Sequence, residues 1–409
     1  MIDKQKSNME FETDLLSLKD EFSSELIDLL AFWSSSCIDE KHGGFIGKMD
    51  HFGKVDSEAP KGCILNTRIL WTFSAAYRIF KLEAYKTIAD RAYTYIINHF
   101  WDDDNAGLFW ELDALGMQMN SKKQAYAQGF GIYAFSEYYR ATGNDTSLAF
   151  AKELYYIMEH KFWDFQFTGY VEALTQDWQR MDDMRLSAKD LNTPKSMNTH
   201  LHILEAFTNL YRVWPDPKLK NSIQSLLQIF TNKIYDPKTN HLNLFFEVNW
   251  TTHFQEVSFG HDIEGAWLMN EADKVIHDGV LSSEVKSVTA KLVETIISEG
   301  MDADGSVFYE RNGAQVDTDK HWWPQAEGLV GFMDAYDLER NKEYLKRVQK
   351  LWNFIKSHMI DTTNGEWYWR VDQHNNPIVT EDKVGFWKCP YHNTRAMMEL
   401  ISRIEELKR

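Results

Sequence analysis

The 409-residue sequence has little of what marks secreted or membrane-bound proteins. Its three cysteines, Cys37, Cys63 and Cys389, are an odd number without CxxC spacing, which is typical of reduced thiols in the cytoplasm. The N-terminus lacks an apolar segment behind a basic start, and no apolar run reaches the roughly 20 residues that a membrane helix needs. We therefore expect a cytoplasmic protein that does not associate with a membrane.

Positive charge and linker residues are also scarce. The formal net charge is −17 and no cluster of Lys and Arg occurs, which excludes a nucleic-acid partner. Only 8 prolines and 21 glycines are present, and no Pro/Gly-rich linker divides the chain. We expect one domain over residues 1–409, present as a monomer or a homodimer.

Sequence motifs for several chemistries are missing. The sequence contains no GxSxG, no P-loop and no GxGxxG followed by a suitable acidic residue, so no cofactor is expected. His200 and His202 point to different faces of a helix and cannot share a metal. His261 and Glu264 could share one, but no HExxH, Cys cluster or second pair completes a ligand set. The sequence thus predicts a metal-free protein in which Glu264 orients His261.

Aromatic residues, by contrast, are abundant, and one phrase recurs six times. The chain has 15 Trp, 18 Tyr and 25 Phe, most of which must belong to the core. Each phrase has an apolar residue, an aspartate, turn-forming residues and a short alternation typical of a β-hairpin. Its aspartates lie 59 to 72 residues apart, at Asp39, Asp102, Asp164, Asp236, Asp302 and Asp361.

The sequence between the phrases has the pattern of paired helices. Residues 65–80 and 84–100, for example, carry apolar residues at i, i+3, i+4 and i+7. Six units of two helices predict about twelve helices, and closing them into a ring leaves no end repeat exposed. We expect an all-α (α/α)6 barrel with short β-hairpins or loops at one end.

The helix after each phrase should belong to the same ring, so equivalent positions of these helices should face one centre. Their candidate site residues are Arg68, Tyr126, Asn198, His202, His261, Glu264, Trp322, Trp323, Glu327, Trp387 and His392. Arg68 alone has the pattern of an ion-pair partner, and any one histidine is as readily structural. Three histidines at the same phase of different repeats favour a functional site, because polar groups lining a barrel centre cost desolvation energy.

Four of these segments closely resemble the cellobiose 2-epimerases, within the N-acylglucosamine 2-epimerase superfamily. They are KSMNTHLHILEAF, GHDIEGAWL, HWWPQAEG and GFWKCPYHNTR, in the order of the family, and the resemblance covers nearly the whole chain. It implies an (α/α)6 barrel with the site in its central cavity. It also implies epimerisation at C2 of the reducing-end glucose of β-1,4-linked disaccharides such as cellobiose, lactose and mannobiose.

The resemblance also implies roles for single residues. His261 and His392 resemble the family's two general acid/base histidines. Residues that resemble those holding the reducing-end sugar or supporting ring opening are Arg68, Asn198, His202 and Glu264, and Trp323 and Trp387 resemble stacking residues. We count His202 with the catalytic residues as well, and Tyr126, Trp322 and Glu327 with the substrate-binding residues.

The implied chemistry suits two histidines. Ring opening makes C2 an α-carbon whose carbanion is an enediolate, and a histidine pKa near 6.5 lets one group remove a proton and another return one. Arg68 would polarise the oxyanion. The alternatives are an N-acylglucosamine 2-epimerase, an aldose–ketose isomerase, an inverting glycoside hydrolase on the same barrel, and a non-catalytic binding module. A small sugar is the expected partner.

Overall fold

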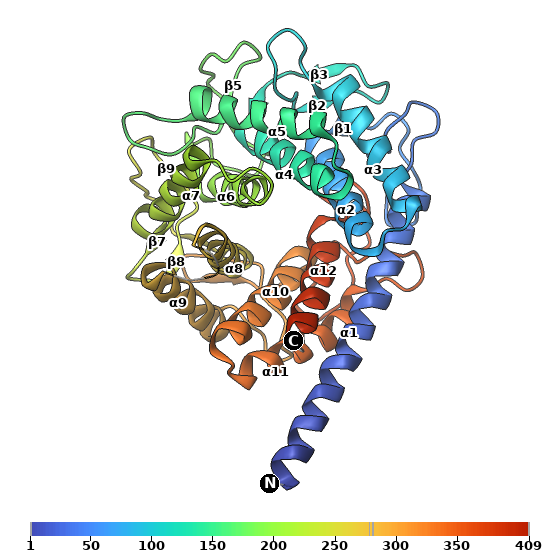
Figure 1. Ribbon diagram of the computed structural model, residues 1–409, viewed down its shortest axis with the longest axis vertical. Coiled ribbons are helices and arrows are strands. Elements are labelled where there is room, and N and C mark those ends of the chain that lie inside the picture. Colours follow the sequence, from blue (N-terminus) through green and yellow to red (C-terminus); the bar gives the residue numbers. More distant parts are fainter. Residues whose placement is uncertain (1, 278, 280–281, 408–409) are drawn as a thin grey trace.

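The computed structural model describes residues 2–277, 279 and 282–407, and within them twelve α-helices form two concentric rings (Figure 1). The inner ring consists of α2 (Cys63–Phe80), α4 (Ala125–Thr142), α6 (Met197–Tyr211), α8 (Phe259–Ile276), α10 (Trp322–Glu339) and α12 (Tyr391–Glu406). The outer ring consists of α1 (Ile2–Ser36), α3 (Glu83–Tyr95), α5 (Asp145–Ile157), α7 (Pro217–Ile229), α9 (Ser283–Glu299) and α11 (Lys342–Phe354). The predicted (α/α)6 barrel is confirmed.

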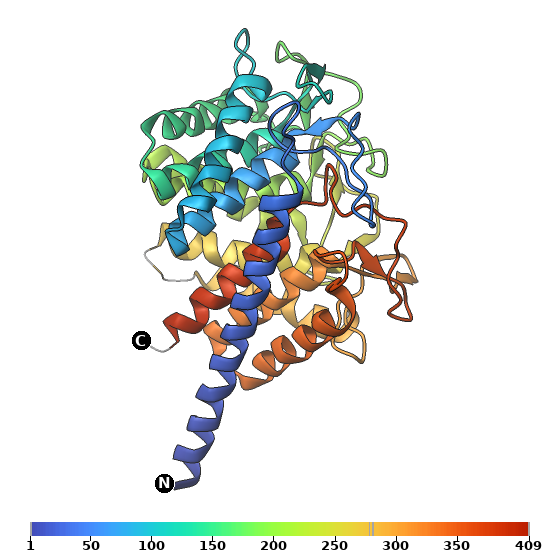
Figure 2. The same ribbon diagram turned by 90° about the vertical axis from the view of Figure 1, so that its right-hand side faces the viewer.

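The two rings differ in how their helices bury apolar residues. Every residue of α2 from Cys63 to Ala76 is buried, because this helix packs on all sides. The outer helix α11 buries one stripe that includes Leu345, Val348 and Trp352. Helix α1 packs along α12, and its N-terminal part extends past the barrel (Figure 2). No helix in the described part of the chain is long and apolar enough to cross a membrane.

Four outer helices end in a π-helical turn of the same length. These turns are η1 (Ile96–Phe100), η2 (Met158–Phe162), η3 (Phe230–Ile234) and η4 (Ile355–Met359). Each ends two residues before the aspartate of its repeat. The recurring phrase therefore marks the point where an outer helix turns into a hairpin.

Short antiparallel strands connect neighbouring repeats at one end of the barrel. They are β1 (Lys61–Gly62), β2 (Glu111–Leu112), β3 (Gln118–Asn120), β4 (Lys123–Gln124), β5 (Ala173–Leu174), β6 (Lys195–Ser196), β7 (Tyr235–Asp236), β8 (His241–Leu242), β9 (Phe245–Phe246), β10 (Glu256–Ser258), β11 (Glu310–Asn312), β12 (Gln315–Asp317), β13 (Lys320–His321) and β14 (Arg370–Val371).

The pairing of these strands explains why the hairpins share one end. The strand that leads into an inner helix pairs with the next repeat, as β1 does with β2, β4 with β5, β6 with β9, β10 with β11 and β13 with β14. A bridge between Met49 and Val384 joins the first repeat to the last. The hairpins thus form a closed rim around one mouth of the barrel.

A buried lysine holds the aspartate of five repeats. The pairs are Lys61–Asp39 at 2.7 Å, Lys123–Asp102 at 2.8 Å, Lys195–Asp164 at 2.7 Å, Lys320–Asp302 at 3.0 Å and Lys383–Asp361 at 2.7 Å. In the fourth repeat Val257 takes the place of the lysine, and His241 instead pairs with Asp262 at 2.6 Å. Removing one partner of a fully buried pair, such as Lys123–Asp102 or Lys383–Asp361, costs roughly 3–5 kcal/mol, so the aspartate has a structural role in these five repeats.

Candidate active site

A cavity of about 500 Å³ lies at the hairpin end of the barrel, where the inner helices begin. Ten of the eleven residues predicted from the sequence line it, namely Arg68, Tyr126, Asn198, His202, His261, Glu264, Trp322, Trp323, Trp387 and His392. They come from the first two turns of all six inner helices or from the segment just before one. Glu327 is the exception, and its carboxylate lies behind His392.

The cavity continues outward into a hollow of about 430 Å³ between the hairpins and the segment 184–191. Asn198, His261 and Trp323 border both parts. Small-molecule sites typically measure about 300–1,000 Å³, so the inner cavity with this extension has room for a disaccharide.

Arg68 is a buried cation without an acidic partner. Its Nη2 donates to the Tyr126 hydroxyl at 2.9 Å, and its guanidinium lies 4.3 Å from the Phe130 ring and 4.5 Å from the Tyr391 ring. Its Nη1 donates to Cys389 Sγ at 3.6 Å, and among the residues that the structure describes no carboxylate forms an ion pair with it, so the ion-pair interpretation of Arg68 is wrong. The guanidinium is available to an oxyanion in the cavity.

His392 is held by a carboxylate from the neighbouring inner helix. Its Nδ1 lies 2.6 Å from Oε1 of Glu327, so Nδ1–H donates and the lone pair of Nε2 is free. Burial, and then the charges of Arg68 and Arg395, lower the pKa of His392 well below 6.5. His392 is therefore neutral at pH 7 and can accept a proton on Nε2 as a base.

Nδ1 of His202 also faces a carboxylate, and Nδ1 of His261 faces a hydroxyl group. The Nδ1 atom of His202 lies 2.9 Å from Oε2 of Glu205, and that of His261 lies 2.7 Å from Oγ of Ser258. The expectation that Glu264 orients His261 is thus wrong, because Ser258 occupies that position. Burial lowers the pKa of both histidines below the ordinary value assumed from the sequence.

His200 has a structural role. Its Nδ1 lies 2.7 Å from the Ser196 carbonyl oxygen, and its Nε2 accepts from the Tyr170 amide at 2.9 Å. The prediction that His200 and His202 point to different faces is confirmed.

Three glutamates surround Arg395, a buried residue of α12. Its Nη2 donates to Glu264 at 2.8 Å and to Glu327 at 2.6 Å, and its Nη1 donates to Glu205. Burial and the charge of Glu327 raise the pKa of Glu264 well above 4.5. Glu327 accepts further bonds from His392 and from Trp267 at 3.0 Å, whereas Oε2 of Glu264 has no protein partner among the described residues. Glu264 therefore carries the proton.

One group of side chains has the composition of a metal site, and it was not predicted from the sequence. It consists of Glu264, Glu327 and His392. One ligand atom from each lies within 4.8 Å of the other two. The three come from three helices, so spacing along the chain could not reveal them. The guanidinium of Arg395 contacts both carboxylates at 2.6–2.8 Å, and a divalent cation would have to displace it. The group does not fit a metal, and metal independence stays a prediction.

The structure distinguishes the two adjacent tryptophans. Trp323 is half-buried, with its ring 4.6 Å from that of His261 and 5.7 Å from that of His392. Trp322 is only 3% exposed and packs on Trp369 at 4.7 Å. Trp323 therefore presents its ring to the cavity. Trp387, also half-buried, lies on another wall beside Tyr126.

Several cavity residues hold buried polar atoms without a protein partner in the described part of the chain. They are Arg68 Nε, Asn198 Oδ1, Glu264 Oε2 and Trp322 Nε1. Buried polar atoms nearly always have partners in folded proteins, and these four include donors and acceptors. A ligand rich in hydroxyl groups, which donate and accept, would satisfy such a set.

Sequence reasoning missed Glu205, Ser258 and Arg395. The spacing of the first two was visible, since Glu205 follows His202 by three residues and Ser258 precedes His261 by three. Arg395 follows His392 by three residues, but its glutamates lie on other helices.

Comparison with known proteins gives consistent matches over nearly the whole chain. The family model described as N-acylglucosamine 2-epimerase matches residues 44–396. A cellobiose 2-epimerase of Bacteroides fragilis is 44% identical over 94% of this chain and 98% of its own. The structure of a cellobiose 2-epimerase from Bacillus thermoamylovorans has a TM-score of 0.91 at 38% identity, covering 95% of this chain and 99% of that one.

A more distant likeness concerns the fold alone. A GH76 α-mannanase of Bacteroides thetaiotaomicron is 12% identical, with a TM-score of 0.65, and the match covers 95% of this chain and 96% of that one. The barrel therefore occurs in glycoside hydrolases too, and only the site can decide between the two chemistries.

Proposed function

The chain belongs to the N-acylglucosamine 2-epimerase family and is an epimerase, and we propose that it inverts C2 of the reducing-end glucose in β-1,4-linked disaccharides such as cellobiose. The observation that carries the proposal is the convergence on one cavity of three neutral histidines and Arg68, which has no carboxylate partner among the described residues. The similarity to cellobiose 2-epimerases supports a disaccharide substrate.

Ring opening is the first step. Glu264, which keeps its proton, donates it to the ring oxygen O5 as the C1–O5 bond breaks. A cavity histidine accepts the proton of the O1 hydroxyl through Nε2, and C1 becomes an aldehyde. The new imidazolium is stabilised by its partner on Nδ1, and the negative charge left on Glu264 faces Arg395 at 2.8 Å.

Inversion at C2 then uses two histidines, and His261 and His392 take these roles. The neutral one removes the C2 proton, and the bonding electrons form an enediolate whose negative oxygen lies beside Arg68. The imidazolium formed during ring opening returns a proton to the opposite face of C2. On ring closure the O5 hydroxyl returns its proton to Glu264 as O5 attacks C1, and the histidine that took the C2 proton gives it to O1, so all groups regain their starting charge.

The spacing of the site's glutamates does not favour hydrolysis. Inverting glycoside hydrolases place their two carboxyl groups about 6.5–9.5 Å apart, on either side of the scissile bond. The ligand atoms of Glu264 and Glu327 lie within 4.8 Å of each other, and both carboxylates bind Arg395. Glu327, moreover, lies behind His392 and does not border the cavity.

Product analysis after incubation with cellobiose tests the proposal. We expect glucosyl-mannose. Free glucose would instead identify a hydrolase, glucosyl-fructose as the main product an aldose–ketose isomerase, and unchanged cellobiose a binding protein. Parallel incubations with lactose, mannobiose and N-acetylglucosamine would rank the substrates, and a preference for N-acetylglucosamine would overturn the disaccharide assignment.

A further inference from the structure

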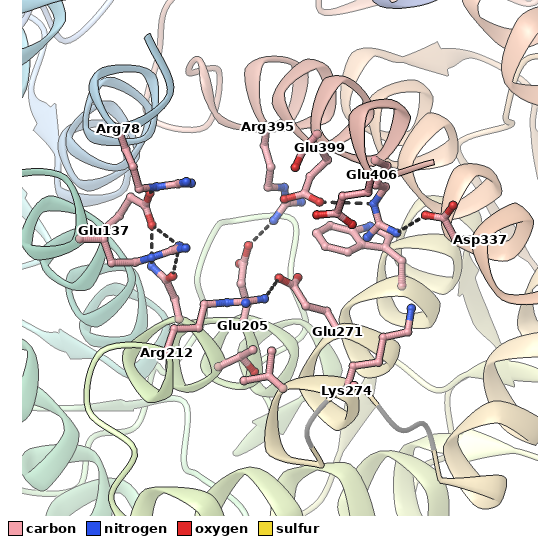
Figure 3. Close-up of a pocket in the computed structure, with 18 of the residues that line it drawn as sticks. Arg78, Glu137, Glu205, Arg212, Glu271, Lys274, Asp337, Arg395, Glu399 and Glu406 are labelled. Atoms are coloured by element: carbon pink, nitrogen blue, oxygen red, sulfur yellow. Dashed lines mark hydrogen bonds and ion pairs between the residues drawn. The ribbon is translucent and has the colours of Figure 1, made fainter. Parts of the chain in front are cut away.

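A second cavity, of about 800 Å³, lies at the other mouth of the barrel, where the inner helices end (Figure 3). Cations from the ends of these helices line it, namely Arg78, Arg140, Arg212, Lys274, Arg340 and Arg403. Cations at helix C-termini are favourable, and each of these also pairs with a carboxylate, so their presence has a structural explanation.

Two residues that line this cavity, Glu205 and Arg395, contact active-site residues from behind. Figure 3 shows Glu205 and Arg395 bonded to each other at the floor of the second cavity. On the other side, Glu205 contacts His202 at 2.9 Å and Arg395 contacts Glu264 at 2.8 Å. A layer of buried side chains that includes Glu205 and Arg395 thus connects the second cavity to the active site.

Within this layer, one guanidinium contacts the carboxylate partners of two histidines. Nη1 of Arg395 donates to Oε1 of Glu205, whose Oε2 holds Nδ1 of His202. Nη2 donates at 2.6 Å to Oε1 of Glu327, which holds Nδ1 of His392. Arg395 is 1% exposed, and its guanidinium also packs 4.2 Å from the Tyr391 ring.

We propose that Arg395 is a positioning residue that keeps His202 and His392 in one tautomer, with Nδ1 protonated and Nε2 free toward the sugar. The proposal rests on the proposed function, because only a proton-transfer role requires the free Nε2. Arg395 acts through the two glutamates and does not touch substrate.

The physical reason is the charge state of these glutamates. An ionised carboxylate can only accept, so it requires a proton on the facing Nδ1. A protonated carboxyl group can donate to Nδ1 instead, which leaves the proton on Nε2 and removes the base. Burial raises the pKa of both glutamates and the charge of Arg395 lowers it; the pKa of Glu205 ends below its usual value and that of Glu327 above it. Loss of Arg395 therefore shifts both toward the protonated form.

Other charged and titratable groups face the same histidines and stay in place when Arg395 is changed. Around His202 they are Arg68, Tyr126, Glu205, His261 and Tyr391, and around His392 they are Arg68, Glu205, Glu264, Glu327, Tyr391 and His202. Arg395 alone bonds to the carboxylate partner of each, so its loss should change both histidines together.

The test is nitrogen-15 NMR of the histidine rings in sugar-free, full-length protein, with signals assigned by His202→Asn and His392→Asn. In the unmodified protein we expect both rings with Nδ1 protonated. In Arg395→Met both should shift toward the Nε2-protonated tautomer, and kcat should fall at least about 100-fold, the lower range of acid–base contributions, with a smaller change in KM. Glu205→Gln should alter His202 alone.

Arg403→Met is the matched control. Arg403 lies on the same helix and lines the same second cavity, but it pairs with Asp334 at 2.9 Å and Asp337 at 3.2 Å. Its loss should leave both tautomers and kcat unchanged. If Arg395→Met does not fold, Arg395→Lys, which keeps the charge but cannot reach both glutamates, should change one or both tautomers.

A folded Arg395 variant with both tautomers unchanged, or with only one of the two histidines affected in Arg395→Met, would overturn the proposal. The NMR experiment contains no sugar, so it decides the role of Arg395 even if the unmodified protein fails to epimerise cellobiose. That failure would overturn the proposed function separately.

Discussion

Nδ1 of His392 lies 2.6 Å from Oε1 of Glu327, although 65 residues separate the two in the sequence. The packing of α12 beside α10 creates this contact, and it directs Nε2 of His392 to the cavity. The packing of two consecutive inner helices therefore also prepares the base.

Replacing either His261 or His392 by alanine should reduce epimerisation to less than about a tenth of the wild-type rate, because each proton transfer contributes roughly 10²–10⁴-fold. The measurement is initial rate with cellobiose, alongside thermal unfolding. His200→Asn is the control, since His200 bonds only to backbone atoms. It should lower Tm and keep kcat. A variant of His261 or His392 that retains more than a tenth of the rate would remove that histidine from the mechanism.

Trp387→Ala should raise KM for disaccharides at least several-fold, because its half-exposed ring borders the cavity. Trp352→Ala is the matched control, as this tryptophan is 1% exposed in the outer ring. Loss of such a buried ring typically costs about 3–5 kcal/mol of unfolding free energy, with no effect on KM. If Trp387→Ala lowers Tm and leaves KM unchanged, Trp387 is a core residue and does not stack on sugar.

The pH dependence of kcat/KM should have its acid limb below pH 6.5. A base must be neutral to act, and burial lowers the pKa of His202, His261 and His392 below that value. Activity should also fall at alkaline pH, when Glu264, whose pKa is raised, loses its proton.

Stability must be followed over the same pH range. Unfolded histidines titrate near 6.5 and the buried ones at lower pH, so the unfolded state binds more protons in acid and stability falls as the pH drops below 6.5. An acid limb centred at or above pH 6.5 in folded protein would contradict the histidine assignment.

Exhaustive chelation should leave activity unchanged. Arg395 contacts both carboxylates of the group that could otherwise bind a cation. The measurement is epimerisation rate after dialysis against a chelator, with an untreated sample as the control. A loss of activity that one divalent cation restores would show that this interpretation of the group is wrong.

The fold could be predicted because each repeat carries its own signal. The aspartate phrase and the paired apolar helices recur six times, and closure into a ring follows from the need to cover both ends. The buried lysines, such as Lys61 and Lys195, also recur from repeat to repeat, but their burial was not predicted. A charged residue suggests a surface position unless its partner is known.

The cavity residues could be predicted for the same reason, since each lies in the first two turns of an inner helix or just before one. The residues that hold the cavity side chains in place could not be predicted. The contacts of Arg395 with Glu205, Glu264 and Glu327 join four inner helices, and helical spacing reports only neighbours on one helix. The lowered pKa of the histidines is likewise a consequence of burial that composition does not contain.

The origin of the hydrogen at C2 tests the two-histidine mechanism most directly. In D2O the O1 hydroxyl carries deuterium, so the histidine that accepts this deuteron during ring opening delivers it to C2. NMR of glucosyl-mannose formed from cellobiose in D2O, at low conversion, should show deuterium at C2 and at no other carbon. Full retention of protium at C2 would contradict the mechanism.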